Sequence, residues 1–125
     1  MAKIEHFEDL ECWQKSRELV KYVYLISREG GLSKDYDLRS QLRKAALSVM
    51  NNIAEGFSRY SAKEFIRFLD ISLGSNGEVK SMIYVLTDLN YINEKQIKKL
   101  HEITDNTRNL TLGLIRYLKK RENKT

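Results

Sequence analysis

The sequence predicts an all-α protein, a single domain over residues 1–125 that folds as an antiparallel, up-and-down four-helix bundle. The chain contains no proline and only six glycines, so little interrupts a long helix. Four long segments place apolar residues three and four positions apart, which is the spacing of one buried helix face. Short breaker clusters separate these segments, and short links between long helices join antiparallel neighbours.

The first helix is expected over residues 9–29. Asp9 is its predicted N-cap, because an aspartate side chain accepts hydrogen bonds from the unpaired N–H groups of the first turn. Gly30 and Gly31 are the predicted stop, since glycine readily adopts the conformation that ends a helix. The apolar stripe of this helix consists of Leu10, Trp13, Val20, Val23 and Tyr24.

The second helix is expected over residues 36–55. Either Ser33 or Asp35 could cap its start, and Gly56 stands where a C-terminal stop is expected. A buried face with three- and four-residue spacing runs along it. That face consists of Leu38, Leu42, Ala45, Ala46, Val49 and Ile53.

The third helix is expected over residues 61–90, with Ser61 and Glu64 forming a capping box at its start. If it is continuous it is about 45 Å long. Its stripe consists of Phe65, Phe68, Leu69, Ser72, Val79, Met82, Ile83, Leu86 and Leu89. The fourth helix is expected over residues 93–121, opened by Asn93 and Gln96. Its stripe consists of Ile97, Leu100, Ile103, Thr107, Leu110, Leu114 and Leu118.

Composition limits the class of protein. No apolar run approaches the roughly 18–20 residues that a membrane-spanning helix needs. Residues 1–10 are polar and mixed in charge, which is unlike a signal peptide. Cys12 is the only cysteine, so an internal disulfide is excluded. We therefore expect a cytoplasmic protein.

Few residues suggest catalysis. His6 and His101 are the only histidines, and Asp105, four residues after His101, is interpreted as its partner in a surface pair. Cys12 could be a nucleophile only with a nearby base that lowers its pKa; its place in the first turn of a helix favours this slightly, but we interpret it as a plain small side chain. The glycines of residues 74–77 lie inside a predicted helix and match no phosphate-binding loop. We expect no enzyme activity, metal or cofactor.

A polar cluster is predicted where the second helix turns into the third. Asn52 and Glu55 share a helix face, as do Ser75 and Glu78, and Arg59 is expected to pair with a carboxylate. Gly74 and Gly77 would allow close backbone approach. A buried carboxylate persists only when it is paired and hydrogen-bonded, so we predict one network. It either fixes the corner between the helices or forms a site for a partner. The predicted members are Asn52, Glu55, Arg59, Ser75 and Glu78.

Positive charge is concentrated in two regions. The net charge is +5, and residues 39–67 carry six positive and two negative side chains, while residues 93–125 carry nine and four. These regions are either ordinary solvated faces or a surface for phosphates. Cations near a helix C-terminus are favoured by the macrodipole, so the cluster from Arg116 to Arg121 is weaker support. The predicted phosphate-binding residues are Arg39, Arg43, Lys44, Arg59, Lys63 and Arg67.

Aromatic side chains lie among these cations. Phe57 and Tyr60 flank Arg59, and rings beside cations suit stacking on unpaired bases. They suit a protein–protein interface equally well.

The chain resembles the four-helix-bundle proteins encoded within intervening sequences of bacterial 23S ribosomal RNA genes. That family is similar in fold to the accessory variability determinants of diversity-generating retroelements. One departure is the absence of a proline in Ser48-Val49-Met50, where the family often has one. The matching stretches are Phe7-Glu8-Asp9-Leu10 with Trp13, residues 41–46 with Ser48, Asn52-Ile53-Ala54-Glu55-Gly56 with Arg59, Lys63-Glu64-Phe65 with Phe68-Leu69, and Gly74-Ser75 with Glu78.

The resemblance implies a homopentamer of four-helix bundles around a central pore. It also implies basic surfaces, through which the retroelement relatives bind nucleic acid and a reverse transcriptase. We therefore predict a non-catalytic homo-oligomer that binds RNA or DNA, with a protein–protein interaction adaptor as the alternative. The aromatic residues expected at a subunit interface are Tyr22, Tyr84, Tyr91 and Tyr117.

Overall fold

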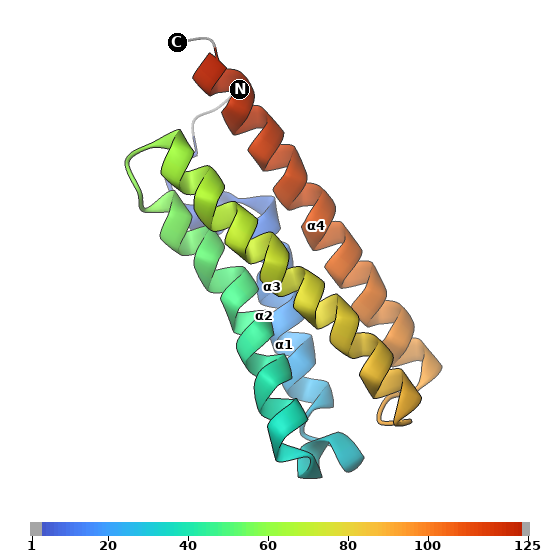
Figure 1. Ribbon diagram of the computed structural model, residues 1–125. Coiled ribbons are helices and arrows are strands. Elements are labelled where there is room, and N and C mark those ends of the chain that lie inside the picture. The colour runs from blue at the N-terminus through green and yellow to red at the C-terminus, as the bar shows by residue number, and fades with distance from the viewer. Residues whose placement is uncertain (1–3, 124–125) are drawn as a thin grey trace.

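A computed structural model describes residues 4–123 of the chain. Its long elements are α1 (Glu11–Ile26), α2 (Tyr36–Phe57), α3 (Ala62–Asp88) and α4 (Glu94–Asn123), with short 3-10 helices η1 (Phe7–Asp9) and η2 (Gly31–Lys34). Each long helix packs against two others, in the cyclic order α1, α2, α3, α4 (Figure 1). Residues 4–123 contain no strand. The predicted antiparallel four-helix bundle is confirmed.

The start of α1 differs from the prediction. Residues 7–9 form η1, and Leu10 has an extended backbone (φ −74°, ψ 124°) that separates this turn from α1. Leu10 is therefore the N-cap residue, and no side chain caps the helix. The prediction that Asp9 is the cap was wrong, because Asp9 is itself the last residue of the 3-10 turn.

The start of α2 is capped by Asp35, one of the two predicted candidates. Its Oδ1 accepts a hydrogen bond from the backbone N–H of Leu38 at 3.3 Å, and its Oδ2 accepts one from the hydroxyl of Tyr91 at 3.0 Å. The aspartate thus caps the helix and also ties α2 to the link between α3 and α4.

The end of α2 lies beyond Gly56, so the prediction that this glycine stops the helix was wrong. Gly56 is buried, and a Cβ built on it would lie 2.7 Å from Cβ of Phe68. The glycine is needed because α3 crosses α2 closely at this point. The helix ends one residue later, at Phe57.

Only half of the predicted capping box at the start of α3 is formed. Oγ of Ser61 accepts a hydrogen bond from the backbone N–H of Glu64 at 3.1 Å. The carboxylate of Glu64 instead accepts a hydrogen bond from Nε of Arg67 at 2.9 Å. At α4 the cap is reciprocal, since Asn93 and Gln96 each accept from the other's backbone N–H, at 2.8 and 2.9 Å.

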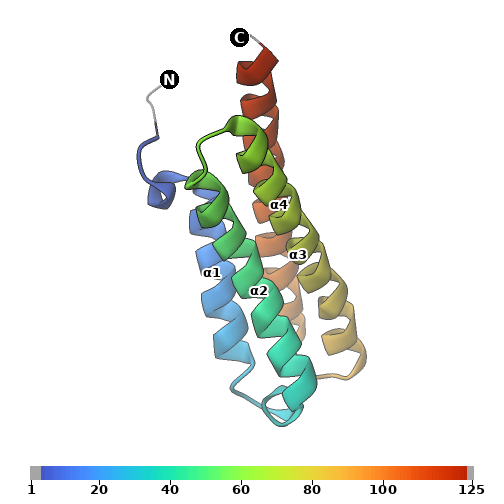
Figure 2. The same ribbon diagram turned by 60° about the vertical axis from the view of Figure 1, so that its left-hand side comes forward.

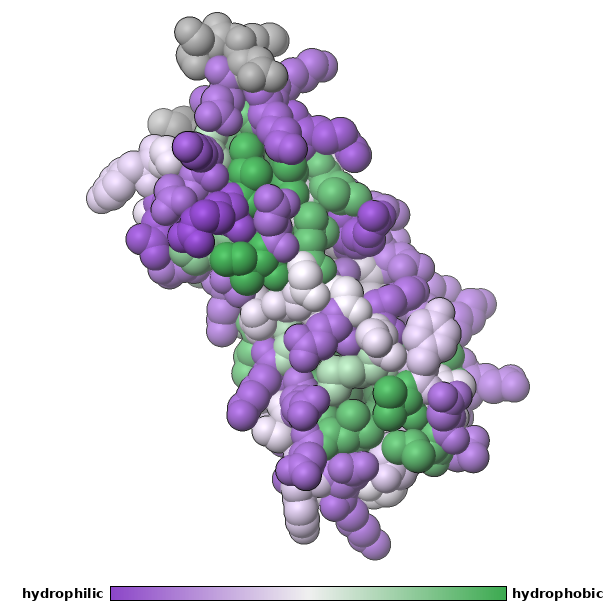
Figure 3. All heavy atoms as spheres, viewed as in Figure 1, coloured by the Kyte–Doolittle hydropathy of each residue, from purple (hydrophilic) through white to green (hydrophobic). Residues whose placement is uncertain are grey.

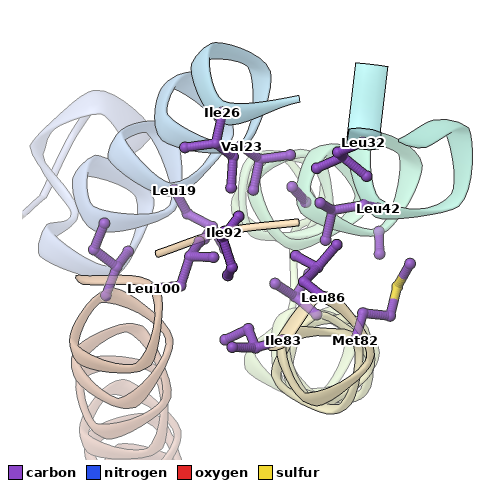
Figure 4. Close-up of a cluster of buried hydrophobic side chains, with 14 of the residues drawn as sticks. Leu19, Val23, Ile26, Leu32, Leu42, Met82, Ile83, Leu86, Ile92 and Leu100 are labelled. Atoms are coloured by element: carbon purple, nitrogen blue, oxygen red, sulfur yellow. The ribbon is translucent and has the colours of Figure 1, made fainter. Parts of the chain in front are cut away.

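The core has two hydrophobic clusters with polar side chains between them. One cluster lies at the end of the bundle where α1 joins α2 and includes Leu19, Leu42 and Ile83 (Figure 4). The other, at the opposite end, includes Ile53 and Leu69. Along α1, α3 and α4, the residues between the segments that form the two clusters include buried polar side chains. These are Ser16, Ser72, Asn76, Thr104, Thr107 and Thr111.

The buried polar groups are mostly satisfied by backbone carbonyls. Oγ of Ser72 donates to the carbonyl of Val49 at 2.7 Å, and Nδ2 of Asn76 donates to the carbonyl of Thr104 at 2.9 Å. These bonds link α3 to α2 and to α4. Within residues 4–123, no helix combines the length and apolar character that a membrane crossing demands.

Candidate nucleic-acid interface

The six predicted phosphate-binding residues do not form one patch. Arg39, Arg43 and Lys44 lie in the first half of α2, whereas the other three lie after its end and in the first turns of α3. Arg59 lies sixteen positions after Arg43, which is about 24 Å along a helix. The structure therefore divides the predicted set into two groups at opposite ends of the bundle.

The two arginines near the start of α2 serve the fold. Nη1 of Arg39 donates to the carbonyl of Ser33 at 2.7 Å. Nε of Arg43 donates to Oγ of Ser27 at 2.8 Å, and its guanidinium lies 4.5 Å from the ring centre of Tyr24. Both side chains are half-buried and connect α2 to the link that follows α1. Only Lys44 of this group is exposed.

The corner between α2 and α3 holds two ion pairs around one ring. Nη2 of Arg59 lies 2.6 Å from Oε1 of Glu55, and Nε of Arg67 lies 2.9 Å from Oε2 of Glu64. Both guanidiniums lie over the ring of Phe68, at 4.9 and 4.7 Å. The hydrogen bond from Arg67 lowers the pKa of the Glu64 carboxyl. Because these pairs are exposed, water screens them, and the arginines can exchange partners.

The C-terminal part of α4 brings further cations to the same end of the bundle. The ends of α2 and α4 and the start of α3 lie together there (Figures 1 and 2). The guanidinium of Arg121 lies 5.7 Å from the ring centre of Tyr117. Arg116, Lys119 and Lys120, the other cations of this part of α4, are exposed. We name this region the basic end. It comprises Arg59, Lys63, Arg67, Arg116, Lys119, Lys120 and Arg121.

Acidic residues limit the extent of the basic end. Glu55, Glu64 and Glu122 lie within its segments, and Glu8, Asp9 and Glu11 precede or open α1 at the same end. The side formed by α3 and the C-terminal turns of α4 therefore carries the cationic excess, and the side of α1 does not.

The predicted polar network is smaller than expected and uncharged. Nδ2 of Asn52 donates to the carbonyl and to Oγ of Ser48 at 2.8 and 3.0 Å, and Oγ of Ser48 lies 2.7 Å from Oγ of Ser75. This chain joins α2 to α3. Ser48 was not a predicted member, although its spacing of four residues from Asn52 places both on one helix face.

The carboxylates lie outside this network, so that part of the prediction was wrong. The expected pairing of Arg59 with a carboxylate is confirmed, but the pair that it forms with Glu55 lies at the surface. Glu78 is exposed and makes no hydrogen bond or ion pair with the residues the structure describes. The reason is register: Val79 and Met82 take the buried positions of this part of α3, which turns Glu78 outward.

Gly74 and Gly77 do not serve close packing within the chain. A Cβ on either would have no neighbouring atom within 4 Å. They lie on the exposed side of α3, where Ile71 and Val85 remain 41% and 42% exposed. Figure 3 views this side and shows apolar patches along it. We name it the outer face of α3, defined by Ile71, Gly74, Gly77, Glu78, Ser81 and Val85.

Of the four tyrosines predicted for a subunit interface, two are used within the chain and two remain exposed. The hydroxyl of Tyr91 donates a hydrogen bond to Asp35, and Tyr22 packs against the core. Tyr84 and Tyr117 remain 58% and 38% exposed.

A hollow lies beside the basic end, between the start of α1, the α2–α3 corner and α4. It has a volume of about 910 Å³. Its apolar lining includes Phe57, Phe65, Leu110, Leu114 and Tyr117. Figure 3 shows apolar residues between the first half of α3 and the second half of α4. Sequence reasoning missed this hollow, because it depends on how far α4 extends past its neighbours.

Two of the residues considered for catalysis, Cys12 and His101, are buried and half-buried, respectively, by other side chains. Burial raises the pKa of the Cys12 thiol to about 11. Asp105 pairs with Lys80 at 2.8 Å and not with His101, so the predicted surface pair was wrong. The imidazole of His101 instead lies against the ring of Tyr84, with centroids 5.3 Å apart, and burial lowers its pKa. Among residues 4–123, no three metal-ligating side chains come together.

Comparison with known proteins supports the fold and a family. A family model described as 23S rRNA-intervening sequence protein matches residues 8–113. A crystal structure of a protein of unknown function from the S23 ribosomal protein family, from Bacteroides thetaiotaomicron, superimposes with a TM-score of 0.76. The two sequences are 24% identical, and the match covers 84% of this chain and 95% of the other. No curated protein matches the chain.

Proposed function

Since the chain belongs to the family of 23S rRNA-intervening sequence proteins, we propose that it is a non-catalytic, homo-oligomeric bundle that binds nucleic acid. The observation that carries this proposal is the basic end, where cations from two segments distant in the sequence lie at one end of the bundle. Phosphates would cross the side formed by α3 and the last turns of α4. Lys63, Lys119 and Lys120 are exposed there.

The binding surface differs from the one that the sequence predicts. Arg39 and Arg43 are engaged with backbone and side-chain oxygens of their own chain, so we assign them to the fold. Arg59 and Arg67 remain candidates, because their exposed carboxylate partners compete only weakly with phosphate.

The setting of the possible nucleophile supports a binding function. With a pKa near 11, the Cys12 thiol is a poor nucleophile at neutral pH. Among the residues that the structure describes, none forms a hydrogen bond with the buried Nδ1 of His101 that would orient the ring for proton transfer.

We further propose that subunits meet through the outer face of α3, in a pentamer like the one that the sequence resemblance implies. A glycine inside a helix costs about 1 kcal/mol relative to alanine. Gly74 and Gly77 both carry this cost, and no contact among residues 4–123 requires either of them. A helix of a second copy packed on this face would explain both glycines and would cover Ile71 and Val85.

Light scattering tests the assembly. The measured mass of the wild-type protein should be a multiple of the 14.7 kDa chain mass. A Gly77→Gln variant should dissociate, because its side chain would block the close approach of a second copy to α3. Gly113→Gln in α4 is the control, since it places the same side chain in another helix. A wild-type protein that runs at 14.7 kDa, or a Gly77→Gln variant that stays assembled, contradicts this proposal.

Fluorescence anisotropy with labelled RNA and DNA tests nucleic-acid binding. Affinity should fall steeply with salt, because phosphate contacts release counterions. Removing Lys119 and Lys120 together should lower the slope of log K against log salt by about 2. Lys95→Ala with Lys98→Ala, at the opposite end of α4, is the control with the same charge change.

Two results would contradict the nucleic-acid proposal. One is no binding to structured RNA or duplex DNA at low salt. The other is an equal loss of affinity in the Lys119/Lys120 and Lys95/Lys98 double variants, which would indicate only an effect of net charge. Co-purification with one defined protein, unaffected by nuclease, would favour the adaptor function instead.

A further inference from the structure

The connection between α2 and α3 presents one aromatic ring entirely to solvent. The side chain of Tyr60 is 108% exposed, compared with 67% for Tyr36 and 58% for Tyr84. Its ring makes no hydrogen bond or ring contact with the residues the structure describes. A tyrosine buries substantial apolar area when it finds a partner, so this ring is available for a ligand.

The other aromatic rings of this corner are used by the fold. Phe57 and Phe65 pack edge to face, with centroids 5.9 Å apart. The ring of Phe68 is covered by the guanidiniums of Arg59 and Arg67. The exposure of Tyr60 is therefore specific to that ring and is not a general feature of the corner.

The backbone on both sides of Tyr60 is held. The N–H of Ser58 donates to the carbonyl of Ala54 at 3.2 Å, and the N–H of Arg59 donates to that of Gly56 at 3.1 Å. On the other side, Ser61 caps α3. The ring is thus carried by a short turn anchored at both ends, which lowers the entropy cost of binding.

The neighbours of Tyr60 favour a nucleotide over an apolar protein surface. Arg59 is adjacent, and Lys63 is exposed three residues later. The remaining residues of the turn, Ser58 and Ser61, are polar and exposed. A protein hot spot usually lies inside an apolar patch, whereas a base on an aromatic ring needs cations beside it for its phosphates.

From this arrangement we propose that Tyr60 stacks on an unpaired base, so that the basic end selects single-stranded or looped nucleic acid over a continuous duplex. Bases inside a duplex are already stacked on each other and cannot offer a free face to the ring. This inference rests on the proposed nucleic-acid function and adds the class of substrate to it.

Anisotropy titrations with a single strand of about 12 nucleotides and with the matching duplex test the proposal. Wild-type protein should prefer the single strand. Tyr60→Ala should weaken single-strand binding roughly 5- to 150-fold, the range for losing one stacked base, and should leave duplex binding unchanged. Tyr60→Trp should keep the affinity, and Tyr36→Ala, an exposed tyrosine at the other end of the bundle, should have no effect.

The outcomes separate this inference from the proposed function. Circular dichroism of each variant serves as the control that it is folded. If Tyr60→Ala leaves single-strand affinity unchanged, or weakens both ligands equally, the stacking role is overturned while nucleic-acid binding stands. If the wild-type protein binds neither ligand at low salt, the proposed function itself fails.

Discussion

Replacing Gly56 with alanine should destabilise the protein, although alanine is normally the better residue in a helix. Gly56 lies near the end of α2, directly against α3. The added methyl would lie 2.7 Å from Cβ of Phe68, 3.0 Å from Cδ1 of Phe65 and 3.2 Å from the Phe65 carbonyl oxygen. Carbon atoms in contact are normally about 3.5–4.0 Å apart, so α3 has to move away.

The size of the effect follows from two opposed contributions. Alanine gains at most about 1 kcal/mol over glycine from helix propensity. Overpacking costs about 1–3 kcal/mol, and the high end applies here because Cβ of Phe68 and the Phe65 carbonyl cannot rotate out of the way. The free energy of unfolding should therefore fall by about 1–2 kcal/mol, a change of roughly 5- to 30-fold in the folding equilibrium.

Urea unfolding followed by far-ultraviolet circular dichroism measures this change, with an unchanged slope as the sign that two-state behaviour is kept. Gly113→Ala is the matched control. Its new Cβ would meet only the flexible end of Arg116, at 4.0 Å, so this variant should gain about 1 kcal/mol. All variants are compared at one protein concentration, because assembly adds to apparent stability. If Gly56→Ala is as stable as the wild type or more so, the inference of close helix contact is wrong.

Three further predictions concern buried groups. Asn76→Leu removes a buried Oδ1 that has no partner among the described residues but also the 2.9 Å hydrogen bond from Nδ2 to the Thr104 carbonyl, so the two effects should offset and the free energy of unfolding should change by less than about 1 kcal/mol; a loss above about 2 kcal/mol in urea unfolding would contradict this. Burial and the nearby Lys80 lower the pKa of His101, so its contribution to stability is present above the unfolded pKa and is lost as pH falls through the lower folded pKa. Between about pH 7 and pH 5, wild-type stability should therefore fall more than that of His101→Phe, and parallel pH curves would refute this. Cys12, with a pKa of about 11, should react with a thiol reagent at neutral pH far more slowly in the folded protein than in urea, and equal rates would show that the thiol is accessible.

The sequence by itself determined the four helices and most of their starts. The three- and four-residue apolar spacing depends only on helix geometry, so it predicted most of the buried faces of α2 and α3. It was wrong for most of α1, where Leu19 and Ile26 are buried and the predicted Val20 and Tyr24 are only half-buried, and it was wrong for Leu89, which is 49% exposed. The caps at Asp35, Ser61 and Asn93 were also readable, because a cap bonds only to N–H groups two or three residues away. At Asp9 the same reasoning failed, because a 3-10 turn occupies that stretch.

The tertiary structure alone decided which polar and charged residues of different helices meet. Spacing along one helix could not show that Ser48 of α2 meets Ser75 of α3, or that Lys80 takes Asp105 away from His101. Nor could it show that Gly56 is crowded by α3, since crowding depends on how closely two helices cross. Likewise, the antiparallel packing of separate helices places the cations at the end of α4 beside the α2–α3 corner (Figure 2). Local bonding rules act over a few residues, whereas these meetings depend on the rotation and offset of whole helices, which only core packing determines.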